Sequence, residues 1–412
     1  MLRRDFLALS GATLAAAPVT TPVKAMAAKM TPWLIEQRRD FHRHPELMYQ
    51  EVRTARIVAE RLRALGLEDI RTGIAKTGVT ALIRGAKPGP VIAVRADMDA
   101  LPIDESAQNI PYKSLNPGVK HACGHDAHTT MALGVAEILM SLRGDLAGTV
   151  KMVFQPAEEG GRGARKMIDE GILDNPNVEA IFGQHVWPST NTGSIDYCPG
   201  AFMASGDFFT ITIKGKMSHG ARPEEGIDAV YIASQCVSAL QAIRSRRIST
   251  TDPLVLSIGS IQGGTAANII ADSVVLKGTL RTLDAGVRDR AQTLIHQTLE
   301  GITKAHGGSY EMDLQAIGTV TYNEPKLVER TLPAFERVLG KANVRRIGPQ
   351  MVAEDFSYYQ QKIPGFFYFL GVRNEAKGFV HPVHTPQFDL DEAAMPIGVE
   401  VMTSAVLQYL SI

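Results

Sequence analysis

The order of strand-like and helix-like segments changes near residue 200, and this change restricts the folds open to the chain. Before it, short apolar, β-branched runs bounded by Gly and Pro predict strands, and helical segments separate several of them. The expected strands are 80–83, 91–96, 149–154 and 180–183, and the expected helices are 33–65 with a break at Pro45, 129–142 and 164–170. Strands alternating with helices favour a mostly parallel sheet covered on both faces.

The segments after residue 200 follow the order β-α-β-β-α-β. The expected strands are 207–214, 254–260, 273–281 and 310–316, with helices at 227–244 and 285–306. This order is that of the split ferredoxin-like unit. Because the sheet-and-helix pattern resumes at Pro325, we predict an α/β fold. Its mostly parallel-sheet catalytic domain would comprise residues 28–199 and 318–412, and an α+β domain, residues 200–317, would be inserted into it.

Composition excludes several classes of partner. A chain of 412 residues is too long for one ordinary core, which agrees with two domains. Its 43 basic and 43 acidic residues cancel, and no basic cluster is long enough to suit nucleic acid. Three cysteines do not form a disulfide framework in a chain of this length. No segment after the N-terminus offers the apolar run of a membrane anchor.

The first 27 residues resemble a twin-arginine export signal. Arg3-Arg4 precede an apolar stretch over 6–17, and small residues suit cleavage near Ala25 or Ala27. An ordinary amphipathic helix is the alternative, but the stretch lacks interleaved charge. We therefore expect a periplasmic or secreted protein.

A run of metal-binding residue types occupies positions 121–128. Cys123 and His125 lie two apart at an expected loop-to-helix junction, and Gly124 permits a tight turn between them. Such spacing suits two neighbouring metals that share Cys123. A thiol nucleophile at Cys123 is the alternative.

Carboxylates follow two of the expected strands. Glu159 could bind metal while Glu158 takes a proton from water and passes it on, although a solvated acidic turn is a common use of such a pair. Asp97 and Asp99 could support metal ligands or cap the next element.

Two single histidines complete the candidate metal site. His185 and His384 would each be an ordinary buried or loop histidine if considered alone. A thiolate, imidazoles and a carboxylate are the ligands that borderline-soft divalent ions prefer, so the whole set predicts a two-metal hydrolase. In the inserted domain, His219, Asn268 and Arg281 lie at strand edges or loops, where surface and turn chemistry is their simplest interpretation.

Six motifs occur in one order along the chain. They are 95–102, 121–128, 154–159, 185–188, 351–355 and 384–389. Together they resemble the M20 metallopeptidase family over residue 30 to the C-terminus. The similarity is greatest to its aminoacylase-like amidohydrolase branch, which includes hippurate hydrolases and hydrolases of N-acyl and indole-acetyl amino acids.

The resemblance implies a role for each candidate residue. Two divalent ions (zinc, manganese, cobalt or nickel) would share Cys123, with Glu159 and His384 completing one site and His125 and His185 the other. Glu158 would be the general acid/base. The inserted domain would be a lid and the dimerisation domain of a homodimer. Its His219 would polarise the scissile carbonyl, often from the partner subunit, and Asn268 and Arg281 would hold polar groups of the substrate.

The expected reaction is hydrolysis of the amide bond of N-acyl amino acids or small peptide-like amides. The alternative is an exported, metal-containing protein that binds acyl amino acids without turnover. Two positions depart from the family pattern: Ala271 replaces a usual Pro and Val352 a usual Gly. We expect these to alter the substrate pocket rather than the metal chemistry.

Overall fold

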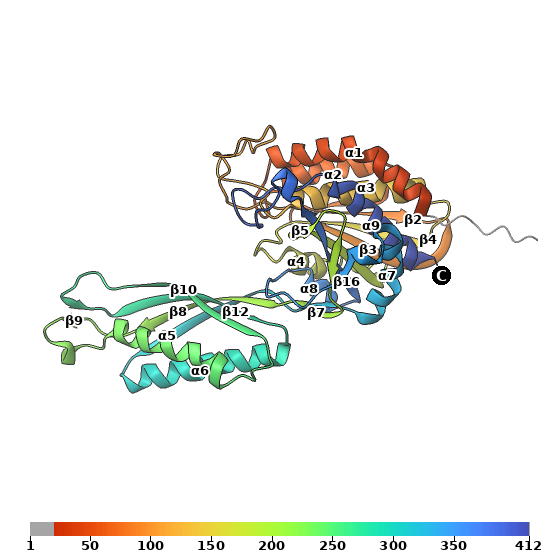
Figure 1. Ribbon diagram of the computed structural model, residues 1–412. Helices are drawn as coiled ribbons and strands as arrows, with labels where there is room; N and C mark the ends of the chain where they lie inside the picture. Colours follow the sequence, from red (N-terminus) through yellow and green to blue (C-terminus); the bar gives the residue numbers. More distant parts are fainter. Residues whose placement is uncertain (1–19, 412) are drawn as a thin grey trace, which may run out of the picture.

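The computed structural model describes residues 20–411 and shows two units (Figure 1). A larger unit contains both ends of the described chain, and a smaller unit, residues 205–318, projects from it and is called the lid below. The larger unit is built on one sheet with strands β1 Glu68–Ile74, β2 Gly78–Arg84, β3 Lys87–Asp97, β4 Ala147–Gln155, β5 Ala180–Asn191, β6 Ile195–Tyr197, β15 Val344–Arg346 and β16 Gly365–Arg373. They lie in the order β1-β2-β4-β3-β5-β16-β6-β15. The central strands β4, β3, β5 and β16 are parallel, whereas β1 and β2 pair antiparallel at one edge. The mainly parallel sheet that the sequence predicts is thus confirmed.

Helices cover both faces of this sheet. One face packs against α1 Thr20–Arg43, α2 Val52–Ala64, α3 His125–Ser141, α7 Pro325–Leu339 and α9 Ala394–Leu410, and the other against α4 Gly163–Asp169 and α8 Ser357–Gln360. Strand β16 shows why both faces need cover. Phe366 and Tyr368 belong to the first core and Phe367 and Phe369 to the second, because successive side chains of a strand point to opposite faces.

The lid has a four-stranded sheet and two helices. Its elements are β8 Ser205–Lys214, α5 Ala229–Arg246, β10 Leu254–Gly263, β12 Ser273–Thr282, α6 Ala285–Ala305 and β13 Ser309–Gly318. The strand order is β10-β12-β8-β13, with every neighbouring pair antiparallel. Phe209, Ile211 and Ile213 are buried beneath the helices, while Phe208 and Thr210 lie on the open face. The predicted β-α-β-β-α-β order is the one observed.

Short elements complete the description. Strands β7 Gly200–Met203 and β14 Thr321–Asn323 pair antiparallel where the chain enters and leaves the lid. Strands β9 Ser218–His219 and β11 Ile269–Ile270 pair at the far tip of the lid (Figure 1). Single 3-10 turns occupy Pro223–Glu225, Lys341–Asn343 and Glu375–Lys377. Within residues 20–411 no helix combines the length and apolar character that a membrane crossing requires.

The start of α1 corrects one prediction. The helix expected from residue 33 begins at Thr20, because the Ala- and Met-rich segment before Trp33 is itself helical and packs into the core. Val23 and Ala27 are fully buried there, so cleavage near Ala25 or Ala27 would remove the first turns of α1. The Arg3-Arg4 motif and the apolar stretch lie outside the described residues, and export remains a prediction.

A fully buried arginine ties α1 to the rest of the larger unit. Arg38 Nε lies 2.8 Å from Asp126 Oδ2 at the start of α3, and its Nη2 lies 2.8 Å from Asp389 Oδ1 in the C-terminal segment. His42, one turn later, contacts the same Asp126 oxygen at 2.7 Å. Removing one partner from such a network leaves buried charge uncompensated.

We therefore expect Arg38→Met to lower the free energy of unfolding by about 3–5 kcal/mol. The control Arg56→Met breaks an exposed pair with Glu60 on α2 and should change it by less than about 1 kcal/mol. Urea titration followed by tryptophan fluorescence reports the larger unit, since the two tryptophans, Trp33 and Trp187, lie on α1 and β5. Equal unfolding midpoints for the two variants would contradict the expectation.

Candidate metal centre

Parallel strand pairing brings distant polar residues to one edge of the large sheet. Asp97 at the end of β3 pairs with Gln155 at the end of β4, and Arg95 pairs with Gly183 on β5. Two residues further along β5, His185 therefore lies level with Asp97. The strand expected over 180–183 would end just before His185, but β5 continues to Asn191 because it stays paired with β16. Strands β3 and β4 end at this level, at Asp97 and Gln155, whereas β16 continues beside β5.

The loop before α3 lies against β5 because it contains a glycine. Gly124 has φ +89°, a conformation that favours glycine, and a Cβ there would lie 2.3 Å from Val186 Cγ2. This close approach places Cys123 and His125 beside His185. The sequence-based prediction of a tight turn between Cys123 and His125 agrees with this geometry.

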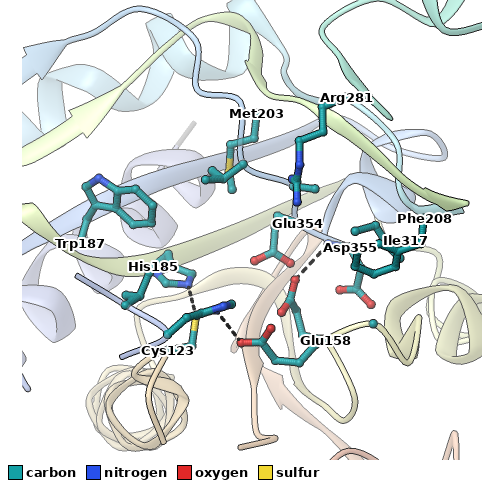
Figure 2. Close-up of a pocket in the computed structure, with 16 residues that line it drawn as sticks. Cys123, Glu158, His185, Trp187, Met203, Phe208, Arg281, Ile317, Glu354 and Asp355 are labelled. Carbon is teal, nitrogen blue, oxygen red and sulfur yellow. Dashed lines mark hydrogen bonds and ion pairs between the residues drawn. The ribbon is translucent and has the colours of Figure 1, made fainter. Parts of the chain in front are cut away.

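Cys123 lies between two histidines, and Figure 2 shows one of them, His185, pointing toward it. Its Sγ is 3.3 Å from His185 Nε2 and 3.3 Å from His384 Nε2, and His384 Nε2 is 3.1 Å from Glu159 Oε1. The His384 backbone N–H donates to the carbonyl of Ala122 over 2.8 Å, which fastens the C-terminal loop to the Cys123 loop. Segments about 260 residues apart in sequence thus share one thiol.

The candidate ligands form two sets that share this thiol. Cys123, His125 and His185 offer ligand atoms within 4.8 Å of one another, and so do Cys123, Glu159 and His384. This is the division between two metals that the family resemblance implies. The structure therefore brings together the five residues predicted as ligands.

Hydrogen bonding orients the imidazoles for metal binding. His185 Nδ1–H donates to the Val186 carbonyl over 2.7 Å, which leaves the Nε2 lone pair facing Cys123. Burial, followed by His128, holds the pKa of His185 well below its usual range, so this ring is neutral, as a ligand must be. The two ring nitrogens of His125 make no well-aligned hydrogen bond among the described residues, although the ring is fully buried; Asp99 Oδ1 lies 3.4 Å from Nδ1 and Asp97 Oδ2 lies 3.6 Å from Nε2. A cation would satisfy it.

The charge around Cys123 also fits a cation rather than a free nucleophile. Burial and the carboxylates of Glu159 and Glu158 raise the pKa of the Cys123 thiol well above its ordinary value. A reactive thiol needs the opposite shift, whereas a bound divalent ion deprotonates a coordinating thiol. Burial opposes a charged His125, yet Asp97 and Asp99 raise its pKa to about 10, which shows how strongly this region attracts positive charge. The residues present fit a pair of divalent ions.

Asp97 and Asp99 support the ligands and do not act as helix caps. Asp99 Oδ1 and Oδ2 accept the backbone N–H groups of Glu158 and Glu159, each over 3.0 Å. Asp97 Oδ1 accepts Nδ1–H of His128 over 2.7 Å, and His128 Nε2 accepts the Val186 N–H over 2.8 Å. His128 thereby links β3 to the residue after His185, a role that no spacing in the sequence indicated.

Glu158 faces a second group of acids. Its carboxylate, Glu354 and Asp355 lie within 4.8 Å of one another, and burial with Glu354 and Glu159 raises the pKa of Glu158 well above its usual range. Arg95 offsets this charge: its Nη2 lies 2.9 Å from Glu354 Oε1 and 3.1 Å from Asp355 Oδ1. A carboxyl group that readily holds a proton beside a metal site suits general acid/base chemistry. Arg95, Glu354 and Asp355 belong to the motifs 95–102 and 351–355, whose residue types indicated no such role.

A cavity of about 500 Å³ opens above these residues. Its lining includes Cys123, Glu158, Glu159, His185 and His384, together with Trp187, Met203, Phe208, Arg281, Ile317 and Val352. Figure 2 shows Arg281 extending from the lid toward the acids. Val352, one of the two departures, lines the cavity, whereas Ala271 lies outside it.

Two predicted site residues do not reach this cavity. His219 is on β9 at the tip of the lid, and the Asn268 carbonyl accepts the Gly220 N–H beside it. Figure 1 shows this tip far from the large sheet. Within one chain, therefore, neither His219 nor Asn268 lies at the cavity.

Comparison with known proteins agrees with this geometry. Residues 93–408 match the model of "Peptidase family M20/M25/M40". The chain belongs to this family. It is 39% identical to thermostable carboxypeptidase 2 of Saccharolobus solfataricus, over 89% of this chain and 92% of that protein. It is 40% identical to N-acetylcysteine deacetylase of Bacillus subtilis, over 88% and 93%.

A solved structure is also similar along its whole length. The YXEP protein of Bacillus subtilis, described as a dinuclear metal-binding peptidase of the M20 family, has a TM-score of 0.77 and 36% identity, covering 94% of this chain and 99% of that one. The M20 chain is thus an amide-hydrolysing enzyme with ligands for two metal ions, not a binding protein without turnover.

Because Cys123 belongs to both ligand sets, Cys123→Ala should remove metal from both sites. His185→Ala and His384→Ala should each remove metal from one. We expect each substitution to lower the affinity for metal by more than the roughly 10- to 100-fold that is typical when a residue hydrogen-bonded to a ligand is replaced. Elemental analysis after gel filtration measures the retained ions, and Cys198→Ala, a buried thiol of the same unit, is the control. Full metal content in Cys123→Ala would rule out ligation by this thiol.

Proposed function

We propose that this M20 enzyme hydrolyses the amide bond of N-acyl amino acids or small peptide-like amides, releasing a carboxylic acid and a free amino acid. Arg281 is the observation that carries the choice of substrate. Its half-buried guanidinium faces the cavity and has no carboxylate partner among residues 20–411; its hydrogen bond is to the Met351 carbonyl over 3.4 Å. Burial without an acid partner lowers the pKa of Arg281.

A substrate with a free α-carboxylate would supply the missing partner of Arg281. Arginine binds carboxylates through two parallel N–H groups, so one such contact fixes orientation as well as position. The names of the carboxypeptidase and the N-acetylcysteine deacetylase agree with substrates that carry this group. The apolar side chains of Trp187, Met203, Phe208 and Ile317 would accommodate an acyl group or an amino-acid side chain.

The residues divide the chemistry among them. Divalent ions held by the two ligand sets would polarise the scissile carbonyl and acidify the attacking water. Glu158, beside the ligands but with its carboxylate toward Glu354, takes the proton of that water and returns it to the leaving nitrogen. Asp99 keeps Glu158 and Glu159 in place through their backbone N–H groups while the proton moves.

A homodimer would bring the lid tip to a catalytic site. Strand β10 lies at the edge of the lid sheet. Val255 and Ile261 on β10, and Val230 and Tyr231 on α5, each expose between 37% and 55% of their surface. An unpaired edge strand with apolar neighbours favours association of two lids. We propose that the partner subunit's His219 completes the oxyanion site, as the family resemblance implies.

The Arg281 proposal can be tested with paired substrates. Arg281→Met should raise the KM for N-acetyl or N-benzoyl amino acids about 10- to 100-fold, because one hydrogen-bonded ion pair is lost. The same substrates with the carboxylate converted to a carboxamide should be cleaved equally by wild type and variant. Release of free amine is the measurement. An equal loss on both substrates would place Arg281 outside carboxylate recognition.

The shared site can be tested by mixing inactive variants. Glu158→Gln should lose about 10²-fold or more in kcat, and His219→Ala should also lose activity. Refolded together, they should recover up to about a quarter of wild-type activity, since half the dimers are mixed and each has one intact site. Glu158→Gln mixed with the double variant is the control. No recovery beyond that control would place His219 elsewhere.

A further inference from the structure

The loop that carries Glu158 contains a strained residue. Ala157, between the end of β4 and Glu158, has φ +54° and is fully buried. A residue with a Cβ pays about 1–2 kcal/mol in this left-handed conformation. The surrounding structure must therefore hold Ala157 in place, and the direction of the next side chain, Glu158, depends on it.

Two buried carboxylates hold three consecutive backbone N–H groups of this loop. Glu51 Oε1 accepts the Ala157 N–H over 2.9 Å, and the two oxygens of Asp99 accept the N–H groups of Glu158 and Glu159. Asp99 holds the backbone of both the metal ligand Glu159 and the acid/base Glu158. Of the three N–H groups of this loop, Glu51 holds only that of Ala157.

The contacts of Glu51 are not those of an ordinary helix cap. It occupies the N-cap position of α2, yet its side chain makes no capping hydrogen bond to that helix. Instead Oε1 also accepts the Tyr49 N–H over 3.0 Å, and Oε2 accepts the Thr77 hydroxyl over 2.5 Å. The side chain is thus aimed across to the loop after β4.

Keeping a carboxylate at this position is costly. Glu51 is fully buried, and no Lys, Arg or His among the described residues pairs with it. Burial raises its pKa to about 7, although the hydrogen bond from Thr77 opposes this shift. A buried acid without a cation partner depends on its hydrogen bonds to offset the cost of burial.

We propose that Glu51 is a positioning residue for Glu158, which it aims at the reacting amide by holding Ala157 in the left-handed conformation. The inference rests on the proposed role of Glu158 as the acid/base. Without Glu51 the loop can relax to ordinary backbone conformations, which turns Glu158 away from its proton-transfer geometry. Glu159 moves less, because Asp99 still holds the N–H groups of Glu158 and Glu159 and the change lies in the torsions of Ala157, which act first on Glu158.

Three substitutions of Glu51 distinguish the effect of its side-chain length from the effect of its negative charge. Glu51→Gln keeps an oxygen for the Ala157 and Tyr49 N–H groups and lets its amide donate to Thr77. Glu51→Asp keeps the charge but is one methylene too short. Glu51→Ala removes both. We expect Glu51→Asp and Glu51→Ala to lower kcat about 10- to 100-fold, a cost typical of a misplaced catalytic group. KM and metal content should stay within about twofold, and Glu51→Gln should keep near wild-type kcat.

Controls make each outcome decisive. Thr77→Val removes the contact to the other oxygen of Glu51 and should leave kcat nearly unchanged. If Glu51→Ala fails to fold, the Asp and Gln variants decide the question. The inference is overturned if Glu51→Asp matches wild type, if Glu51→Gln is as slow as Glu51→Asp, or if added metal restores the slow variants. Full activity of Glu158→Gln would instead overturn the proposed function.

Discussion

A concentration of buried negative charge is the constraint on which this structure depends. Asp97, Asp99, Glu158, Glu159, Glu354, Asp355 and the Cys123 sulfur all face one small region at the edge of the sheet. Arg95 offsets part of this charge from below, with contacts of 2.7–3.1 Å to three of the acids. The remainder favours a pair of cations, and the raised pKa of His125 has the same cause. Strand pairing brings these carboxylates together. Their shared negative charge raises both the affinity of the site for metal ions and the proton affinity of Glu158, so the three are energetically linked.

Much of the fold could be predicted because each segment carried a local signal. Strands β3 and β4 are short apolar runs ended by polar residues, and the lid follows a recognisable order of elements. The start of α1 could not be predicted, since a segment rich in Ala and Met suits both a cleaved leader and a buried helix. Strand β16 is a continuous aromatic run, and without alternation such a run does not distinguish a strand from a buried helix.

The candidate site was predictable where residue types are specific and unpredictable where ordinary residues support them. Cys123, His125 and His384 are types that metals prefer, and their order along the chain indicated a common site. Arg95 and Glu51 act through partners up to 260 residues away, and no motif spacing encodes such contacts. The distance of His219 from the cavity depends on how far the lid projects from the larger unit. The order of elements along the sequence does not indicate this.

The insertion of the lid has a consequence for synthesis of the chain. Strand β16 lies between β5 and β6, so the central sheet cannot close until most of the polypeptide has left the ribosome. The lid has its own hydrophobic core from one continuous segment and is expected to fold earlier. During that interval the edges of β5 and β6 that later pair with β16 stay exposed. Chaperone demand and cotranslational aggregation should therefore respond mainly to codon changes downstream of the lid.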